Sequence, residues 1–273
     1  MAPGDELTVA VGPDEGRFDV REFARTARGS HRDDLDLESI GTAGLDAEAA
    51  RLVRILRDLE RSTLQRMRNL LVTATHKDAR VTAFLTTWAF EKFWIADALE
   101  AVLEATGHHA ESTSGAPRRT AAERAERRGP VRRAIAGNLA GVKLVAAHVT
   151  TGLIDEWVTS AAYQRLAELA ESLESVVATV LEIKQRHIRF LSEEANRRLV
   201  ESSRARRLSR RAVLQAAWPV GAVEQPASER DYLERTVFGG SVGRAAASRI
   251  SDLVAALPGL TPVAPTLTAR LVP

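Results

Sequence analysis

Apolar residues recur at helical spacing over most of the chain, and breaks in this pattern divide it into predicted elements. Asp46 is a suitable N-cap for the first long helix, and Gly107 follows the end of the second. We expect four long helices, over residues 46–75, 78–105, 131–163 (starting at Val131 or Asn138) and 166–207. We also expect short helices near residues 20–27, 228–238 and 242–257, and an extended Pro-rich tail over 258–273.

Charged residues interrupt the apolar stripe of each long helix near its middle. In chain order they are Glu60, Lys92, Glu156 and Lys184, with His187 about one turn beyond Lys184. A buried carboxylate, ammonium or imidazole is strongly unfavourable unless other groups pair with it. The pattern therefore predicts that these five side chains meet in a polar cluster inside the protein.

Three further residues lie on or beside the inner face of the third predicted helix. Gly152 weakens that helix, although a glycine on an inner face also lets a neighbouring helix approach closely. We interpret His148 as a structural histidine that lines the same interior. We interpret Tyr163 as an amphipathic residue packed at the helix end, with its hydroxyl able to reach inward.

The long helices form two pairs, each with an inward Glu followed by an inward Lys. Glu60 precedes Lys92 by 32 residues, and Glu156 precedes Lys184 by 28. A polar, Arg-rich connector over residues 108–130 joins the pairs, as in helical bundles with one crossover. We therefore predict an all-α fold in three parts. They are an extended acidic arm over 1–45, a four-helix bundle over 46–207, and short helices with the Pro-rich tail over 208–273.

Four stretches carry a likeness to a known superfamily. They are LRDLERSTLQRM at 56–67, FLTTWAFEKFWIADALEAVL at 84–103, IDEWVTSAAYQRLAELAE at 154–171 and EIKQRHIRFL at 182–191. Together they resemble the ferritin-like superfamily, on the side of the rubrerythrins and acyl-carrier-protein desaturases. The resemblance covers residues 46–207. It implies a bundle in which each helix pair supplies one Glu and then a Glu-x-x-His to hold two irons.

The chain departs from that ligand pattern in a consistent direction. Glu60 and Glu156 match the two lone carboxylates, and His187 matches the second histidine. Lys184 stands where the Glu of the second motif is expected, and the first motif reads Lys92–Ile95 without carboxylate or imidazole. Two ammonium groups near an incoming Fe(II) would repel it. We therefore expect two Glu–Lys pairs in place of the di-iron site, hydrogen-bonded to His187, with no cofactor and a binding or assembly role.

Two other activities stay open at this point. If the second helix is aligned with the Glu-x-x-His motif one residue earlier, half of the metal-ligand set is retained. The resemblance then implies that the chain binds iron. It also implies an oxygenase-like or desaturase-like oxidoreductase acting on an apolar substrate. The donors of such a site are Glu60, Glu91, Glu156 and His187. Alternatively, Lys92 or Lys184 is a catalytic residue, because burial lowers the pKa of a lysine and makes it a base or Schiff-base nucleophile.

Composition narrows the classes of function further. The chain has no cysteine, which excludes disulfides, thiolate metal sites and cysteine nucleophiles. No run of 18 apolar residues exists and the acidic start lacks a signal-peptide pattern, so we expect no membrane span and a cytoplasmic location. Basic residues gather in Arg118–Arg133 and Arg198–Arg211 without interleaved aromatics, which argues against nucleic-acid binding. The partners left open are a small apolar ligand, another protein, and a second copy of the chain, since ferritin-like bundles commonly dimerise.

Overall fold

The computed structural model describes residues 16–108 and 141–273, and within these residues it is all-helical and contains no strand. The fold class predicted from the apolar spacing is thus confirmed at the all-α level. Residues 1–15 of the predicted arm, most of the predicted connector and the predicted start of the third long helix lie outside the described residues. The α-helices are α1 (Val20–Arg25), α2 (Leu37–Ala43), α3 (Ala47–Arg61), α4 (Thr63–Leu71), α5 (Ala79–Ala105), α7 (Leu144–Leu169), α8 (Glu174–Glu201), α9 (Ser203–Gln215), α10 (Ala227–Phe238), α11 (Gly240–Ala256) and α12 (Ala264–Leu271).

Aspartate N-caps set the start of the two helices that carry the first half of the core. The Asp46 carboxylate accepts a hydrogen bond from the backbone of Ala49 at 2.7 Å, where α3 begins. Asp78 caps α5 in the same way, with Val81 as the donor at 3.0 Å. The predicted start at Asp46 and the predicted extent of the second long helix are confirmed.

The first and fourth long helices predicted from spacing are each divided in the structure. A break at Ser62 separates α3 from α4, and the Ser62 hydroxyl donates to the Leu59 carbonyl at 2.8 Å. Such side-chain bonds compete with the helical backbone ladder. The single helix expected over 166–207 is also wrong. The chain turns at Ala170, α8 begins at Glu174, and the extended Ser202 separates α8 from α9.

The Pro-rich tail is helical rather than extended, which corrects a second expectation. Residues 264–271 form α12, which follows a short 3₁₀ turn over Thr261–Val263. Proline stands in the first turn of each of these elements. Because the first backbone N–H groups of a helix have no intrahelical acceptor, proline there removes no hydrogen bond.

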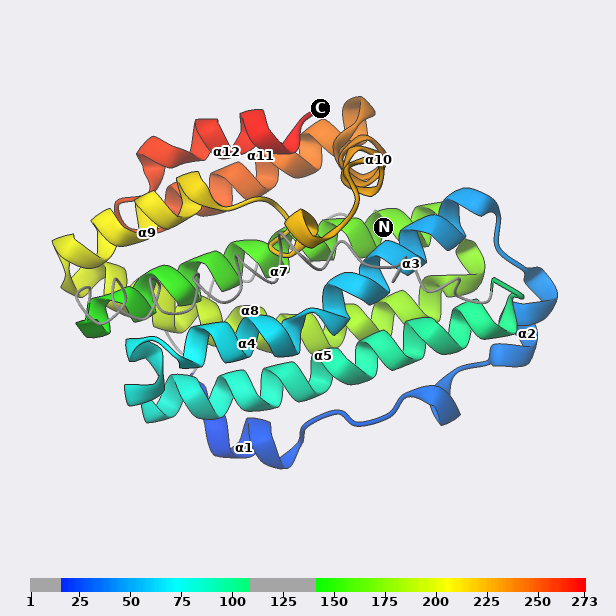
Figure 1. Ribbon diagram of the computed structural model, residues 1–273, viewed down its shortest axis with the longest axis horizontal. Helices are drawn as coiled ribbons and strands as arrows, with labels where there is room; N and C mark the ends of the chain where they lie inside the picture. Colours follow the sequence, from blue (N-terminus) through cyan, green and yellow to red (C-terminus); the bar gives the residue numbers. More distant parts are fainter. Residues whose placement is uncertain (1–15, 109–140) are drawn as a thin grey trace, which may run out of the picture.

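Helices α3, α5, α7 and α8 pack around a shared interior (Figure 1). The contacts run from α3 to α5, from α5 to α8, from α8 to α7 and from α7 back to α3. Helix α7 also contacts α9, α10 and α11, which lie together on one side of the molecule with α12. On the opposite side, α1 and α2 pack on α5. The buried apolar side chains form one connected core from Phe18 to Leu271.

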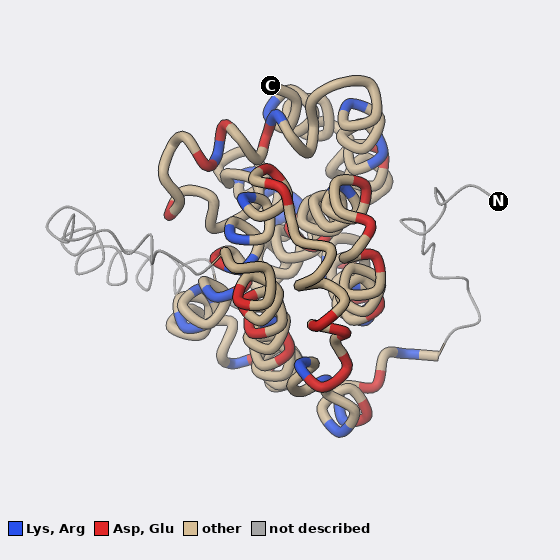
Figure 2. Tube along the Cα trace, turned by 90° about the vertical axis from the view of Figure 1, so that its right-hand side faces the viewer, with Lys and Arg blue, Asp and Glu red and all other residues tan. Residues whose placement is uncertain are grey.

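Charges on the outside of the helices are mixed in sign. Basic and acidic positions are interspersed along the described trace (Figure 2). In the second Arg-rich run, Arg198 pairs with Asp78 at 2.6 Å and with the buried Glu194 at 2.8 Å. The first run, over 118–133, lies outside the described residues. None of the described helices combines the length and apolar character that crossing a membrane requires.

Candidate functional site

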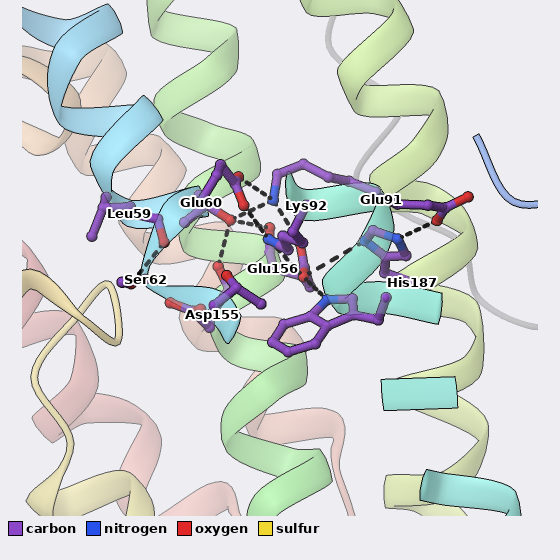
Figure 3. Close-up of polar contacts among 12 residues, drawn as sticks. Leu59, Glu60, Ser62, Glu91, Lys92, Asp155, Glu156 and His187 are labelled. Carbon is purple, nitrogen blue, oxygen red and sulfur yellow. Dashed lines mark hydrogen bonds and ion pairs between the residues drawn. The ribbon is translucent and has the colours of Figure 1, made fainter. Parts of the chain in front are cut away.

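One charged side chain from each of the helices α3, α5, α7 and α8 points into the shared interior. These residues are Glu60, Lys92, Glu156 and Lys184, and none is more than 2% exposed. We refer to them as the four-charge cluster. Lys92, Glu156 and Lys184 lie within long helices, whereas Glu60 stands at the end of α3, one residue before its last residue Arg61. The packing of these helices brings the interruptions of the apolar stripes together, as Figure 3 shows for Glu60, Lys92 and Glu156.

Within the four-charge cluster, each ammonium group contacts both carboxylates. Lys92 Nζ lies 2.9 Å from Glu60 Oε2 and 2.9 Å from Glu156 Oε1. Lys184 Nζ lies 2.6 Å from Glu156 Oε2 and 3.5 Å from Glu60 Oε1. Charges of opposite sign therefore alternate around a closed ring, and the formal charge of the ring is zero.

Three neutral side chains add hydrogen bonds to this ring. The indole Nε1 of Trp88 donates to Glu156 at 2.6 Å, and the hydroxyl of Tyr163 donates to Glu60 at 3.2 Å. Lys184 donates to the hydroxyl of Thr159 at 2.8 Å. Buried charges are tolerated when extra hydrogen bonds satisfy their remaining lone pairs and protons. The Oε2 atom of Glu60 makes no such hydrogen bond and is held by its ion pair with Lys92 at 2.9 Å.

The pKa values of the cluster reflect a competition between burial and charge. Burial opposes ionisation of Glu156, but the charges of Lys184 and Lys92 outweigh that penalty and hold its pKa well below the ordinary value. The pKa of Glu60 is lowered by the same balance. For Lys92, burial is outweighed by Glu156 and Glu60, and its pKa is raised. For Lys184, burial together with repulsion from Lys92 prevails over the carboxylates, and its pKa is lowered.

The pKa of Tyr163 is raised well above the ordinary value, by burial and by the charge of Glu60. The phenol therefore keeps its proton at neutral pH, which it needs in order to donate to Glu60. Tyr163 was interpreted as an amphipathic residue at a helix end whose hydroxyl is able to reach inward. The hydroxyl does take a direct part in the polar interior.

His187 pairs with Glu91 rather than with the Glu–Lys pairs. Its Nε2 lies 2.7 Å from Glu91 Oε2, whereas its Nδ1 is 3.7 Å from Glu156 Oε1 and has no hydrogen-bond partner within the described residues. Glu91 also accepts from the backbone N–H of Arg28 at 2.8 Å and lies 3.5 Å from the Arg186 guanidinium. The expected contact between His187 and the Glu–Lys pairs is present as the 3.7 Å approach to Glu156, while the short hydrogen bond of His187 goes to Glu91.

Helix geometry explains why the adjacent residues Glu91 and Lys92 have different partners. Successive residues on a helix point about 100° apart, so Lys92 faces the four-charge cluster while its neighbour Glu91 faces α8 and the loop around Arg28. Both residues are fully buried. The two alignments of the second helix placed either Lys92 or Glu91 at the inward position. In the structure both side chains point inward, each to a different partner.

A third buried ion pair adjoins the cluster on the α4 side. Arg66 Nη1 donates to Asp155 at 2.7 Å and to the Val220 carbonyl at 2.6 Å. Asp155 also accepts from the backbone N–H of Val220 at 2.7 Å. This pair therefore joins α4 to α7 and to the loop before α10. Its aspartate directly precedes Glu156 in the sequence.

The donor set does not fit a di-iron centre. Within residues 16–108 and 141–273, no group of three or more His, Asp or Glu side chains is arranged to hold a metal ion. Between the carboxylates of Glu60 and Glu156 lie two ammonium groups, which carry the positive charge that metal ions supply in a carboxylate site. Glu91 and His187 hydrogen-bond to each other, and His187 Nδ1 lies 3.7 Å from Glu156, whose carboxylate is held by both ammonium groups.

Several members of the site were not recognised as such from the sequence. Trp88 lies four residues before Lys92, and Thr159 and Tyr163 follow Glu156 by three and seven residues. These spacings keep a side chain on the same helical face, so the neutral partners of Glu60, Glu156 and Lys184 were readable from the stripes. No comparable signal links Arg66 to Asp155, because the contact depends on how α4 lies across α7.

Comparison with known proteins gave no match to this chain among protein-family models, curated proteins or solved structures.

Proposed function

We propose that this chain is a ferritin-like four-helix bundle that works without a redox metal, as a binding or assembly protein. The observation that carries the proposal is the closed ring of the four-charge cluster. Each ammonium group lies within 3.5 Å of both carboxylates. The positive charges that neutralise these carboxylates are therefore lysine side chains of the protein itself.

The origin of the charges supports the ferritin-like assignment. Each of α3, α5, α7 and α8 supplies one member of the ring, and the members alternate in sign along the chain. In the superfamily that the sequence resembles, the same kind of helix pair supplies carboxylates that surround two metals. Replacing one carboxylate of each pair by lysine keeps the interior neutral without metal, because two negative charges are removed and two positive charges are added.

The electrostatics oppose metal uptake at this position. A divalent ion placed between Glu60 and Glu156 would have to displace two ammonium groups that already hold them at 2.6–3.5 Å. It would also be repelled by both ammonium charges. Lysine binds a metal only after losing its proton, and at Lys92 the neighbouring carboxylates outweigh burial and oppose that loss.

Metal content tests the proposal directly. The protein is expressed in medium supplemented with iron and manganese, purified without chelator, and analysed by mass spectrometry for iron, manganese and zinc. We expect less than about 0.1 ion per chain, and a melting temperature that does not change with EDTA or added Fe(II), because a ligand that binds the folded state raises that temperature.

A content of about one or two ions per chain, with a visible absorption band, would overturn the proposal and favour the oxidoreductase alternative. In that case Glu91 and His187 are the first residues to replace, because His187 Nε2 lies 2.7 Å from Glu91 Oε2 and the two side chains are the nearest match to a His–carboxylate donor pair. The homodimer implied by the resemblance stays a prediction, which sedimentation analysis of the full chain tests.

A further inference from the structure

A cavity of about 280 Å³ lies between α4, α5, α7 and the loop around Gly221. A smaller apolar hollow of about 30 Å³ adjoins it, since several residues line both. The shared residues are Leu70, Trp88, His148 and Gly152. We refer to the two hollows together as the Gly152 cavity. It reaches from the exposed Val223 to the apolar core.

The walls of the Gly152 cavity are apolar within, and its charged groups are already engaged. Phe84, Leu85 and Leu191 line the inner part. Nearer the mouth, Arg66 is bound to Asp155 and to a backbone carbonyl, so its charge is already neutralised. Together with the exposed Glu224, these lining groups have a formal charge of −1. A ligand carboxylate would meet no free cation here.

One neutral imidazole faces the same space. His148 Nδ1 lies 2.7 Å from the Thr75 hydroxyl, which fixes the orientation of the ring. Burial lowers the pKa of His148 to about 4, so the ring is uncharged near neutral pH. With the amide of Asn69, it gives the cavity hydrogen-bonding groups without a net charge.

Gly152 keeps this space open. Its backbone dihedral angles lie in the region open to all residues, and a Cβ there would meet only the two methyl groups of Leu191, at 3.6 and 3.7 Å. These are ordinary van der Waals distances, so packing against α8 does not require a glycine. The close helix approach suggested by the sequence is therefore not what the glycine provides. A side chain at this position would instead occupy the cavity.

Trp88 connects the Gly152 cavity to the four-charge cluster. Its indole lines both hollows, and its Nε1 donates to Glu156 at 2.6 Å. A molecule in the cavity therefore contacts a side chain that is hydrogen-bonded into the polar interior. Binding there would change the surroundings of the indole, which gives a spectroscopic readout.

We propose that the Gly152 cavity binds a small, neutral, largely apolar molecule that carries a single hydrogen-bonding group. An apolar cavity of about 150 Å³ accommodates benzene, and the Gly152 cavity is about twice that size, which suits a ligand of roughly 9–12 non-hydrogen atoms. The inference rests on the proposed binding function and names its ligand class. It places the ligand beside the four-charge cluster, separated from it by Trp88.

The experiment compares two probes with the same eight-carbon chain length, the neutral 1-octanol and the anionic octanoate. Binding to the full chain at pH 7.5 is followed by calorimetry and by tryptophan emission. We expect saturable binding of 1-octanol at one site per chain. Octanoate should bind at least about tenfold more weakly, because its charge meets no cation in the cavity and would be desolvated.

Variants locate the site. Gly152→Leu should weaken 1-octanol binding by at least about tenfold, because the new side chain fills the ligand volume. Gly152→Ala should weaken it by a smaller but measurable factor, and its single methyl group leaves the fold intact. Ser241→Leu is the control, since it introduces the same leucine side chain at an exposed position of α11 outside the Gly152 cavity. It should leave binding unchanged.

The inference is overturned if 1-octanol does not bind saturably. It is equally overturned if binding is as tight with Gly152→Ala and Gly152→Leu as with the wild type. These outcomes are independent of the metal measurement. A metal-free protein that does not bind 1-octanol defeats the ligand site and leaves the metal-free function standing. A metal-loaded protein that binds 1-octanol in the Gly152 cavity defeats only the proposed function.

Discussion

Replacing Lys184 by Met removes one charge of the four-charge cluster while keeping most of the side-chain volume. In the wild type, Lys184 Nζ lies 2.6 Å from Glu156, 2.8 Å from Thr159 and 3.5 Å from Glu60, and it is fully buried. The variant leaves two buried carboxylates with Lys92 as the single remaining ammonium of the ring. One negative charge thus loses its partner in a place that water does not reach.

Removing one partner of a buried ion pair costs about 3–5 kcal/mol of folding stability. At roughly 2–4 °C per kcal/mol for large domains, the melting temperature should fall by about 6–20 °C. Adding Glu156→Gln restores neutrality. The double variant should therefore recover at least about 1 kcal/mol relative to the sum of the two single changes, which is the size expected for residues in direct contact.

The stability lost in Lys184→Met should increase as the pH rises. In the wild type the pKa values of Glu156 and Glu60 are lowered, so their stabilising contribution is complete above the ordinary glutamate pKa and is lost as pH falls through the lowered values. In Lys184→Met one carboxylate is expected to hold its proton, because it has lost its cation. The difference in stability between variant and wild type should therefore be smaller at pH 4 than at pH 7.

Urea unfolding followed by circular dichroism at pH 4, 5 and 7 measures both quantities. Lys77→Met is the matched control, because Lys77 is exposed and its removal should change stability by no more than about 0.5 kcal/mol. A loss below about 1 kcal/mol for Lys184→Met at pH 7 would refute the reasoning. So would a double variant whose losses are simply additive.

Other consequences of the structure are open to measurement. Reductive methylation of the native protein should modify Lys77 and Lys143, two of its four lysines, because both are exposed; mass-spectrometric peptide mapping that finds the buried lysines modified would contradict the packing. Since burial lowers the pKa of His148 to about 4, stability should fall by at most about 2–3 kcal/mol as pH drops from 6.5 to 4, and a His148→Gln variant unfolded in urea should lack this component. Gly152→Ala should raise stability by about 0.5–1 kcal/mol in thermal unfolding, because it improves helix propensity and meets only methyl groups; destabilisation would show that the space is not free. Tyr163→Phe should lower stability by about 1.5–3 kcal/mol, because Glu60 loses a hydrogen bond, and an unchanged unfolding midpoint would contradict that contact.

The spacing of apolar and charged residues along the chain was sufficient to predict which charged side chains are buried together. The stripes of the long helices place Glu60, Lys92, Glu156 and Lys184 on apolar faces, and those faces must be buried. Since an isolated buried charge is so unfavourable, four such interruptions of balanced sign predict one another as partners. Helix starts at Asp46 and Asp78 were equally readable, because capping depends on residues within one turn of each other.

Features that depend on how helices lie across each other were not readable. His187 could have met Glu156 or Glu91, and only the rotation of α5 against α8 decides for Glu91. The Arg66–Asp155 pair arises where α4 crosses α7 after the break at Ser62.

The Gly152 cavity is likewise a property of the tertiary structure. Local sequence determines which face of a helix is apolar and where a helix is capped, because both follow from residues a few positions apart. Which side chains meet across helices, and what space they leave unfilled, depends on interhelical angles and registers that are decided by the packing of the whole core.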